Sequence, residues 1–166
     1  MTLAALTDRL LAAHARLEAV RPVVAAGAPW PPSPNFGVEP EARWNPPELL
    51  AHLAEMLPYW LGQIDRILAG MEPVPFGRVA SDEGRIEAIG RDRERPVGEL
   101  FDRIGTGVDD VVARVASLDP AAAARRGTHP TRGEMTVEQV TERMVTSHFE
   151  EHVAQLEAIL ETGAGA

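Results

Sequence analysis

Residues 135–160 read MTVEQVTERMVTSHFEEHVAQLEAIL and have the pattern of one long amphipathic helix. Thr136 is a good N-cap, and Gln139 three residues later completes a capping box. Apolar side chains then recur every three or four residues, as on a helix that packs one face against a core. His148 and His152 both fall within this apolar stripe. The segment therefore predicts a long helix with two histidines facing the core.

The spacing of these histidines allows both to bind one ion. Residues four apart on a helix lie about 6 Å apart at Cβ, so His148 and His152 can point at the same place. Apolar surroundings disfavour a protonated imidazole, and two neutral rings facing the core need partners for their nitrogens. Metal ligation and hydrogen bonds to other buried polar groups both meet this need. This helix alone leaves the two explanations open.

The composition narrows the function classes. A length of 166 residues with 45% apolar residues suits a single domain spanning residues 1–166. The chain has no cysteine, so any transition-metal site must use histidine, carboxylate and water. A formal net charge of −9 argues against nucleic acid or an anionic membrane surface as partner. No apolar run approaches the ~18 residues of a membrane span, and we expect a cytoplasmic protein.

Three further segments have helical periodicity, namely residues 2–26, 46–69 and 97–118. His52 lies in the apolar stripe of the second segment. His14 lies in the stripe of the first and stays a reserve ligand, although a lone histidine there is more often an ordinary core or rim residue.

The connections between these helices are long and rich in proline and glycine. Residues 28–43 form a loop in which Trp30 and Phe36 either order a binding lid or simply cover the end of the core. Residues 71–95 form a second long connection with a short helix over residues 81–90, and a third loop precedes residue 135. No segment predicts a convincing strand.

Four long amphipathic helices predict an all-α protein, a four-helix bundle. At ~3.3 Å per residue, the connection over residues 71–95 can run back along a helix of ~37 Å, so the second and third helices can be parallel. This gives an up, down, down, up topology with a long crossover. His52 then lies about 10 Å from the start of its helix and His152 about 13 Å from the end of the last one. Antiparallel packing of these two helices brings His52, His148 and His152 to one level.

Two stretches, WNPPELLAHLAEM (residues 44–56) and GEMTVEQVTERMVTSHFEEHVAQL (residues 133–156), resemble the DinB-like superfamily. This superfamily includes YfiT-like metal-dependent hydrolases and bacterial thiol transferases. The resemblance covers essentially the whole chain and implies an up, down, down, up four-helix bundle. It also implies a divalent metal, zinc or nickel in the first place, held by three histidines that match His52, His148 and His152.

A competing motif overlaps the last helix, because HFEEH fits the H-x-x-E-H pattern of inverted zinc peptidases with Glu151 as general base. Such a site needs another ligand well downstream, whereas fourteen residues follow His152 and His52 already supplies a third nitrogen. Glu151, and Glu55 three residues after His52, are instead candidates to orient an imidazole or act on a bound water. The alternative for both is solvated surface.

Three neutral nitrogens leave at least one coordination position open, which is typical of catalytic zinc. The resemblance therefore favours a metal-dependent enzyme that transfers a low-molecular-weight thiol or hydrolyses a small-molecule substrate, without deciding between the two. Any thiol must come from a cosubstrate, since the chain has no cysteine. The alternative is a non-catalytic, stress-associated metal-binding bundle, which could be a homodimer.

The directions of the helices predict where a substrate pocket lies. Residues 28–43 and 71–95 should cap one end of the bundle, with His129 on the loop at the other end. Arg78 or Arg85 could then bind an anionic group of a substrate or thiol cosubstrate. The remaining lining is expected to be Trp30, Phe36, Trp44, Met56 and Phe76.

Overall fold

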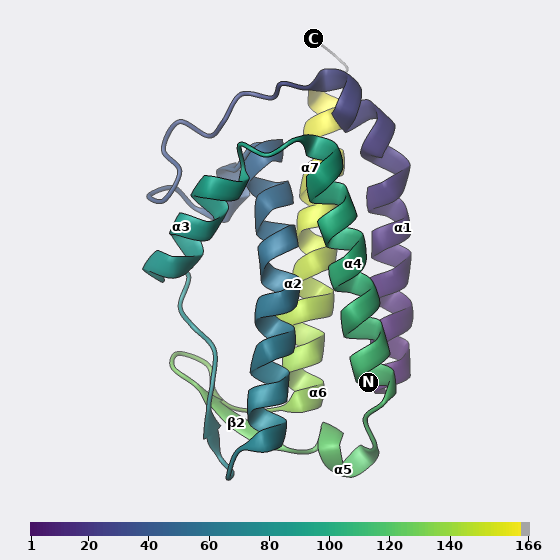
Figure 1. The fold of residues 1–166 in the computed structure, drawn as a ribbon, viewed down its shortest axis with the longest axis vertical. Helices are drawn as coiled ribbons and strands as arrows, with labels where there is room; N and C mark the ends of the chain where they lie inside the picture. Colours follow the sequence, from purple (N-terminus) through teal and green to yellow (C-terminus); the bar gives the residue numbers. More distant parts are fainter. Residues whose placement is uncertain (164–166) are drawn as a thin grey trace.

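Four long helical stretches lie side by side in the computed structural model, which describes residues 1–163 (Figure 1). α1 and α7 run in one direction, and α2 and α4 run in the other. α1 packs against α4 and α7, and α2 packs against the same two helices. The long helical elements are α1 (Leu3–Gly27), α2 (Pro46–Ala69), α4 (Val97–Ala116) and the continuous run α6 (Val137–Val140), η2 (Thr141–Thr146) and α7 (Ser147–Gly163).

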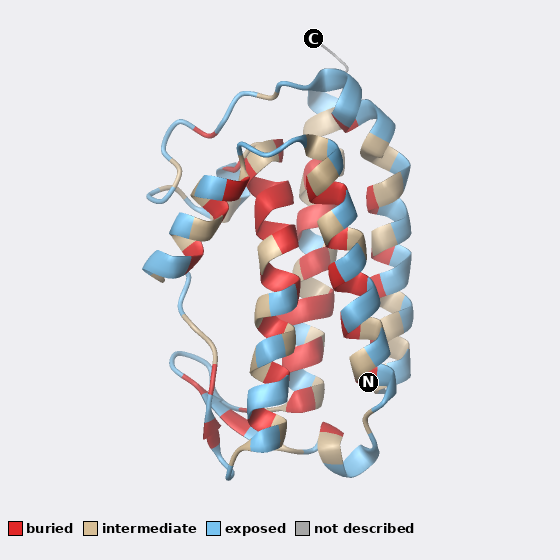
Figure 2. Cartoon of the chain, viewed as in Figure 1, coloured by how far each residue is buried: buried red, intermediate tan, exposed pale blue. Residues whose placement is uncertain are grey.

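The apolar stripes expected from the sequence face inward between these helices (Figure 2). Their burial provides most of the driving force for packing, at roughly 25 cal/mol per Å² of apolar surface removed from water. Among the described residues, none of the helices is long and apolar enough to cross a membrane. The buried side chains of the stripes include Leu6, Leu10, Leu17, Leu53, Met56, Ile64, Ile104, Val108, Val111, Val140 and Leu156.

Local sequence signals explain where the helices begin. The Thr2 side chain accepts a hydrogen bond from the Ala5 amide at 3.2 Å and caps α1. Thr136 and Gln139 form the expected capping box at the start of α6. At α2 the two prolines stand at the first helical positions, but Asn45 makes no side-chain cap. The side-chain nitrogen Nδ2 of Asn45 donates instead to the backbone carbonyl of Pro31 at 3.0 Å, which ties the preceding loop to the helix.

A buried carboxylate fixes the segment before α2. Glu48 is fully buried and accepts hydrogen bonds from the amide and hydroxyl of Ser33, at 3.0 and 2.8 Å. Arg93, just after α3 (Glu83–Asp92), donates to the same carboxylate at 3.0 Å. Because a buried carboxylate is stable only when it is paired, this network joins both long connections to the start of α2.

The chain is mainly helical, as the sequence predicts, but it also contains a small three-stranded sheet that the sequence pattern did not predict. β1 (Val74–Pro75) pairs in parallel with β2 (Arg126–His129), and β2 pairs antiparallel with β3 (Gly133–Thr136). A Cβ at Gly127 would lie 2.5 Å from the Phe76 ring, so only glycine allows this close pairing. Two short helical turns, η1 (Glu41–Arg43) and α5 (Pro120–Ala123), complete the chain. The sheet draws the hairpin of β2 and β3 toward the crossover that follows α2.

The last long helix is not regular throughout. η2 has the i to i+5 hydrogen bonds of a π-helix and ends directly before Ser147. The hydroxyl of Thr141 donates to the carbonyl of Val137 at 2.9 Å, and that of Thr146 donates to the carbonyl of Leu6 at 3.3 Å. The sequence pattern predicted one uniform α-helix here. The wider turn changes which residues face the side of the helix that carries His148.

Candidate metal centre

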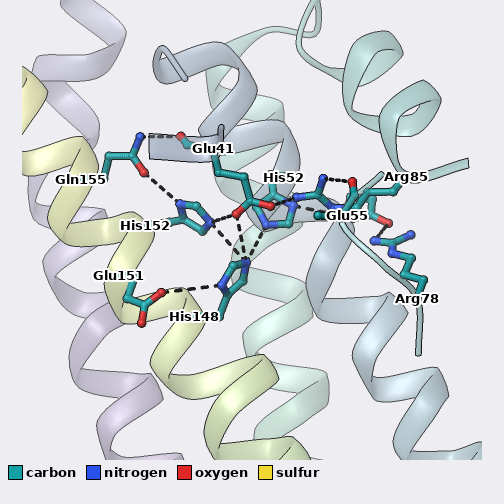
Figure 3. A network of polar contacts seen from close by, with 10 residues as sticks. Glu41, His52, Glu55, Arg78, Arg85, His148, Glu151, His152 and Gln155 are labelled. Carbon is teal, nitrogen blue, oxygen red and sulfur yellow. Dashed lines mark hydrogen bonds and ion pairs between the residues drawn. The ribbon is translucent and has the colours of Figure 1, made fainter. Parts of the chain in front are cut away.

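Three histidines from two antiparallel helices converge on one point (Figure 3). The Nε2 atom of His148 lies 2.9 Å from Nε2 of His52 and 3.3 Å from Nε2 of His152. His52 comes from the second turn of α2, and the other two come from successive turns of α7. The structure therefore places these three side chains together, as the helical spacing and the levels of the helices predicted.

A carboxylate from the loop before α2 joins the histidines. Oε2 of Glu41 lies 3.1 Å from Nε2 of His152 and 3.7 Å from Nε2 of His148. Its other oxygen, Oε1, is ion-paired with the guanidinium of Arg85. The four residues Glu41, His52, His148 and His152 each offer one ligand atom, and these atoms all lie within 4.8 Å of one another. They form a cluster that could hold a divalent ion.

A side-chain oxygen lies near the second ring nitrogen, Nδ1, of each imidazole, but only the one beside His152 is within hydrogen-bond distance. The pairs are His152 with Oε1 of Gln155 at 3.1 Å, His52 with Oε2 of Glu55 at 3.9 Å and His148 with Oε2 of Glu151 at 3.9 Å. Gln155 also donates from Nε2 to the backbone carbonyl of Glu41 at 2.8 Å. Histidines that bind metals usually donate their other N–H to an acceptor, and Gln155 is placed to accept from His152. Nδ1 of His52 has no hydrogen-bond partner among the described residues.

The surroundings favour the neutral forms of His148 and His52 and the ionised form of Glu41. Burial, followed by repulsion from His152, lowers the pKa of His148 to about 4, and burial lowers the pKa of His52 as well. Burial by itself would raise the pKa of Glu41. The hydrogen bond with His152 and the electrostatic interactions with His52 and Arg85 outweigh it and lower that pKa to about 2.

This donor set fits a divalent transition metal. If the imidazole protons are on Nδ1, three Nε2 lone pairs and one carboxylate oxygen face each other at short distances, and a bound cation stabilises this arrangement. Imidazole suits zinc and nickel, and a carboxylate is compatible with both. His52 and His152 are almost fully buried, whereas the side chains of His148 and Glu41 are each 27% exposed. An ion held here would thus be reachable from one side.

That side is a cavity of about 310 Å³, which His52, His148 and Glu41 all line. We expected the pocket at the end capped by residues 28–43 and 71–95, with His129 at the far end. This position is wrong, because His129 itself lines the cavity together with residues of both connections. β1 pairs with β2 and so holds the hairpin of β2 and β3 beside the crossover. The other lining residues of the cavity are Trp60, Arg78, Val79, Ala80, Arg85, His129, Thr131, Arg132, Arg143 and Met144.

The expected aromatic lining lies elsewhere. Trp30 donates to the carbonyl of Val24 at 2.8 Å and covers the end of α1, and Phe36 packs on Trp44 with ring centroids 5.5 Å apart. Trp44, in turn, meets the ring of His52 edge to face at 5.5 Å and supports that ligand from behind. Met56 and Phe76 are buried in the core.

The charged residues expected at the site are two arginines, as candidates for anion binding, and two glutamates, as candidates for catalysis. Arg78 and Arg85 do line the cavity, but their guanidinium groups already pair with Glu55 and Glu41. The carboxylate of Glu55 thereby joins Arg78 to the back of His52. Glu151 is 75% exposed, on the outer side of His148. The structure does not show a role in chemistry for either carboxylate.

His14 and His129 lie apart from the cluster. His14 is half-buried on α1, where its Nε2 lies 3.7 Å from Oε1 of Glu18. His129 is buried in β2 and contacts the carbonyl of Arg78 through Nε2 at 3.1 Å. Neither offers an atom to the candidate metal centre within the described part of the chain.

Two residues of this centre, Gln155 and Glu41, are not predicted by the sequence pattern. Gln155 is three residues after His152 on the same helix, so helical spacing could have suggested it as an orienting partner. No such signal exists for Glu41, because nothing in the loop sequence distinguishes it from Glu39, two residues earlier. Its place depends on contacts with Arg85 and Gln155 that only the folded chain brings together.

Gln155 provides a direct test of the way His152 is oriented. Replacing Gln155 with alanine is expected to weaken zinc binding about 10- to 100-fold, the usual effect of removing a partner of a metal-binding histidine. Isothermal titration of the metal-free protein with zinc would measure the change. Glu151→Gln is the matched control, because its exposed carboxylate should contribute much less. Equal losses in both variants would contradict the assigned role of Gln155.

The fold and the cluster together define a mainly helical protein with a candidate metal centre of three histidines and one glutamate. A family model for the DinB superfamily matches residues 2–156, and the chain belongs to this superfamily. The resemblance seen in the sequence is thus confirmed at the level of the superfamily. No curated protein and no solved structure gave a significant match.

Proposed function

We propose that this protein is a divalent-metal-dependent enzyme that transfers a low-molecular-weight thiol to a small electrophilic substrate or hydrolyses such a substrate. The observation that carries the proposal is the junction between the cluster and the cavity, since His52, His148 and Glu41 belong to both. A small molecule in the cavity can reach the position of the ion. The directions of α1, α2, α4 and α7 support an up, down, down, up four-helix bundle as the scaffold.

The donor set suits this chemistry. A divalent ion held by imidazoles acts as a Lewis acid and lowers the pKa of a water or thiol bound to it. Because the chain has no cysteine, a reacting thiol has to come from a cosubstrate. Glu41, with a pKa of about 2, is ionised near neutral pH, and its Oε2 can accept a hydrogen bond from a water or thiol at the centre. Arg85 holds the other oxygen and keeps this carboxylate in place.

Glu41 also supports a second candidate, a non-catalytic metal-binding protein. If Glu41 and the three histidines all bind a four-coordinate zinc ion, no position stays open, as in structural zinc sites. A six-coordinate ion such as nickel would keep two positions open with the same four ligands. The coordination number, together with the rate of turnover, therefore separates the two candidates.

Turnover by the loaded protein tests the enzymatic proposal. The zinc- or nickel-loaded chain is expected to accelerate the reaction of cysteine or glutathione with 1-chloro-2,4-dinitrobenzene, or the hydrolysis of p-nitrophenyl acetate. The rate should fall to that of the metal-free chain in His52→Ala, because the ion is lost with its ligand. Product absorbance measures both reactions.

Cobalt substitution reports the coordination number of the bound ion and complements the rate measurements. Weak visible absorption, typical of five- or six-coordinate cobalt, would show that positions remain open for a substrate. Intense four-coordinate absorption, together with rates no higher than those of His52→Ala, would favour the non-catalytic candidate and contradict the enzymatic one.

A further inference from the structure

The cavity beside the metal cluster is strongly basic, in a chain whose formal net charge is −9. Four arginines line it, and Glu41 is its only carboxylate among the described residues. The charges of two of these arginines are neutralised by glutamates. Arg85 pairs with Glu41, and Arg78 pairs with Glu55 and stacks over the Tyr59 ring at 3.6 Å.

The other two arginines, Arg132 and Arg143, have no ion pair or hydrogen bond from their guanidinium groups within residues 1–163. Most arginines of the described chain are paired with carboxylates. Arg132 and Arg143 are both exposed, and both line the same cavity. A guanidinium group binds carboxylate or phosphate oxygens through two parallel N–H donors.

The backbone that carries Arg132 is fixed by His129. Nδ1 of His129 accepts hydrogen bonds from the amides of Thr131 and Arg132, each at 3.3 Å, and Nε2 is 3.1 Å from the carbonyl of Arg78. A Cβ at Gly77 would lie 2.4 Å from the His129 ring, which shows how closely the crossover packs on it. The turn of the hairpin is thus held against the crossover, with Arg132 at the cavity.

The π-helical turn explains the place of Arg143. Arg143 lies in η2, five residues before His148, and both line the cavity. In a regular α-helix with 3.6 residues per turn, residues five apart point to different faces. The wider turn of η2 reduces the rotation between them. It therefore brings Arg143 onto the side of the helix where His148 meets the cavity.

We infer that Arg132 and Arg143 form an anion-binding subsite, which holds a carboxylate or phosphate group of the substrate while its reacting group lies at the metal centre. The anion-binding subsite itself does not depend on the proposed function. Only the placement of the reacting group at the metal centre rests on it. The substrate class is then a small organic anion. Its oxyanion is bound by the two arginines, and its thiol or electrophilic carbon reaches the cluster.

Anion binding can be measured without knowing the substrate. We would titrate the metal-free and zinc-loaded protein with succinate and with inorganic phosphate, using isothermal titration and the emission of Trp60, which lines the cavity. Both forms should bind at least one of these anions, more weakly as salt is added, whereas uncharged succinamide should not bind. A preference for succinate or for phosphate identifies the kind of oxyanion.

The variants assign the binding to the two arginines. The double variant Arg132→Gln, Arg143→Gln should bind the anion at least about tenfold more weakly, as the loss of charge-assisted hydrogen bonds implies. Arg66→Gln is the matched control, since Arg66 is exposed, likewise unpaired, and outside the cavity. Zinc binding by the double variant should persist, which shows that it is folded.

Two results would overturn the inference. One is the absence of anion binding in the wild type, and the other is equal binding by the double variant, which would mean that the anion binds the metal or another surface. Failure of the proposed function looks different. A chain that binds no metal, yet binds succinate or phosphate in a way that depends on the two arginines, would disprove the metal centre and keep the subsite.

Discussion

Alanine at His148 is expected to lower the affinity for zinc or nickel by more than about 100-fold. Removing a residue that only hydrogen-bonds to a metal-binding histidine already lowers metal affinity about 10- to 100-fold, and the loss of a ligand should cost more. The wild-type chain should carry close to one divalent ion. His148 is the member of the cluster closest to all the others, with Nε2 2.9 Å from His52, 3.3 Å from His152 and 3.7 Å from Glu41. Elemental analysis after expression with added metal, followed by titration of the stripped protein, measures both quantities.

His14→Ala is the matched control for this variant. It also removes a half-buried histidine from a long helix, but one outside the cluster. His129→Ala should likewise keep the ion, although it loosens the hairpin that lines the cavity. A wild-type protein without metal, or an equal loss of metal in His14→Ala and His148→Ala, would rule out the three-histidine centre.

The helices of this protein could be predicted closely because their signals are local. The segment expected over residues 2–26 is α1, Leu3–Gly27, and prolines and glycine set both ends of α2, Pro46–Ala69. The sheet could not be predicted in the same way. Its strands have two or four residues, too few to show alternation, and their pairing depends on Gly127 fitting against Phe76 in the folded chain.

The same distinction explains what could be predicted of the candidate site. Helical periodicity and helix direction bring His52, His148 and His152 together, so regular geometry is enough to group them. Glu41 begins the short turn η1 within a long connection, and its position follows from tertiary contacts.

For the arginines of the cavity, the sequence gives no information on pairing. Arg78 and Arg85 were the candidates for binding an anion, yet both are neutralised by glutamates. Arg132 and Arg143 became visible as free charges only in the folded chain.

Metal and pH are expected to change the stability of the fold together. Binding to the native state alone adds RT ln(1 + [L]/Kd), about 4 kcal/mol at a thousandfold excess of metal over Kd. The metal-free protein should still lose stability in acid. The pKa of His148 is lowered from 6.5 to about 4, so between these values the unfolded chain binds a proton that the folded chain does not.

Stability therefore rises with pH across this window and falls as the pH drops from 6.5 toward 4, by about 3 kcal/mol for His148 in total. His52, whose pKa burial also lowers, adds to the loss in the same direction. Below pH 4.5 Glu41 contributes further, because its folded pKa of about 2 means that the unfolded chain takes up a proton first. Protonation of the histidines also releases the ion, so the loaded protein loses its added stability over the same range.

Thermal unfolding between pH 4.5 and 8, with zinc and with chelator, measures these effects. We expect the melting temperature to fall on chelation at pH 7.5, and the difference between the two samples to vanish near pH 5. In His148→Ala, chelation should not change the melting temperature. The dependence of stability on pH should be weaker, because a histidine with a lowered pKa has been removed. His14→Ala should behave as the wild type. If the stability of the metal-free wild type stayed constant or increased as the pH fell from 6.5 to 5, His148 and His52 would not be held neutral in the folded chain. Their Nε2 lone pairs would then not be available for an ion, which would contradict the proposed metal centre.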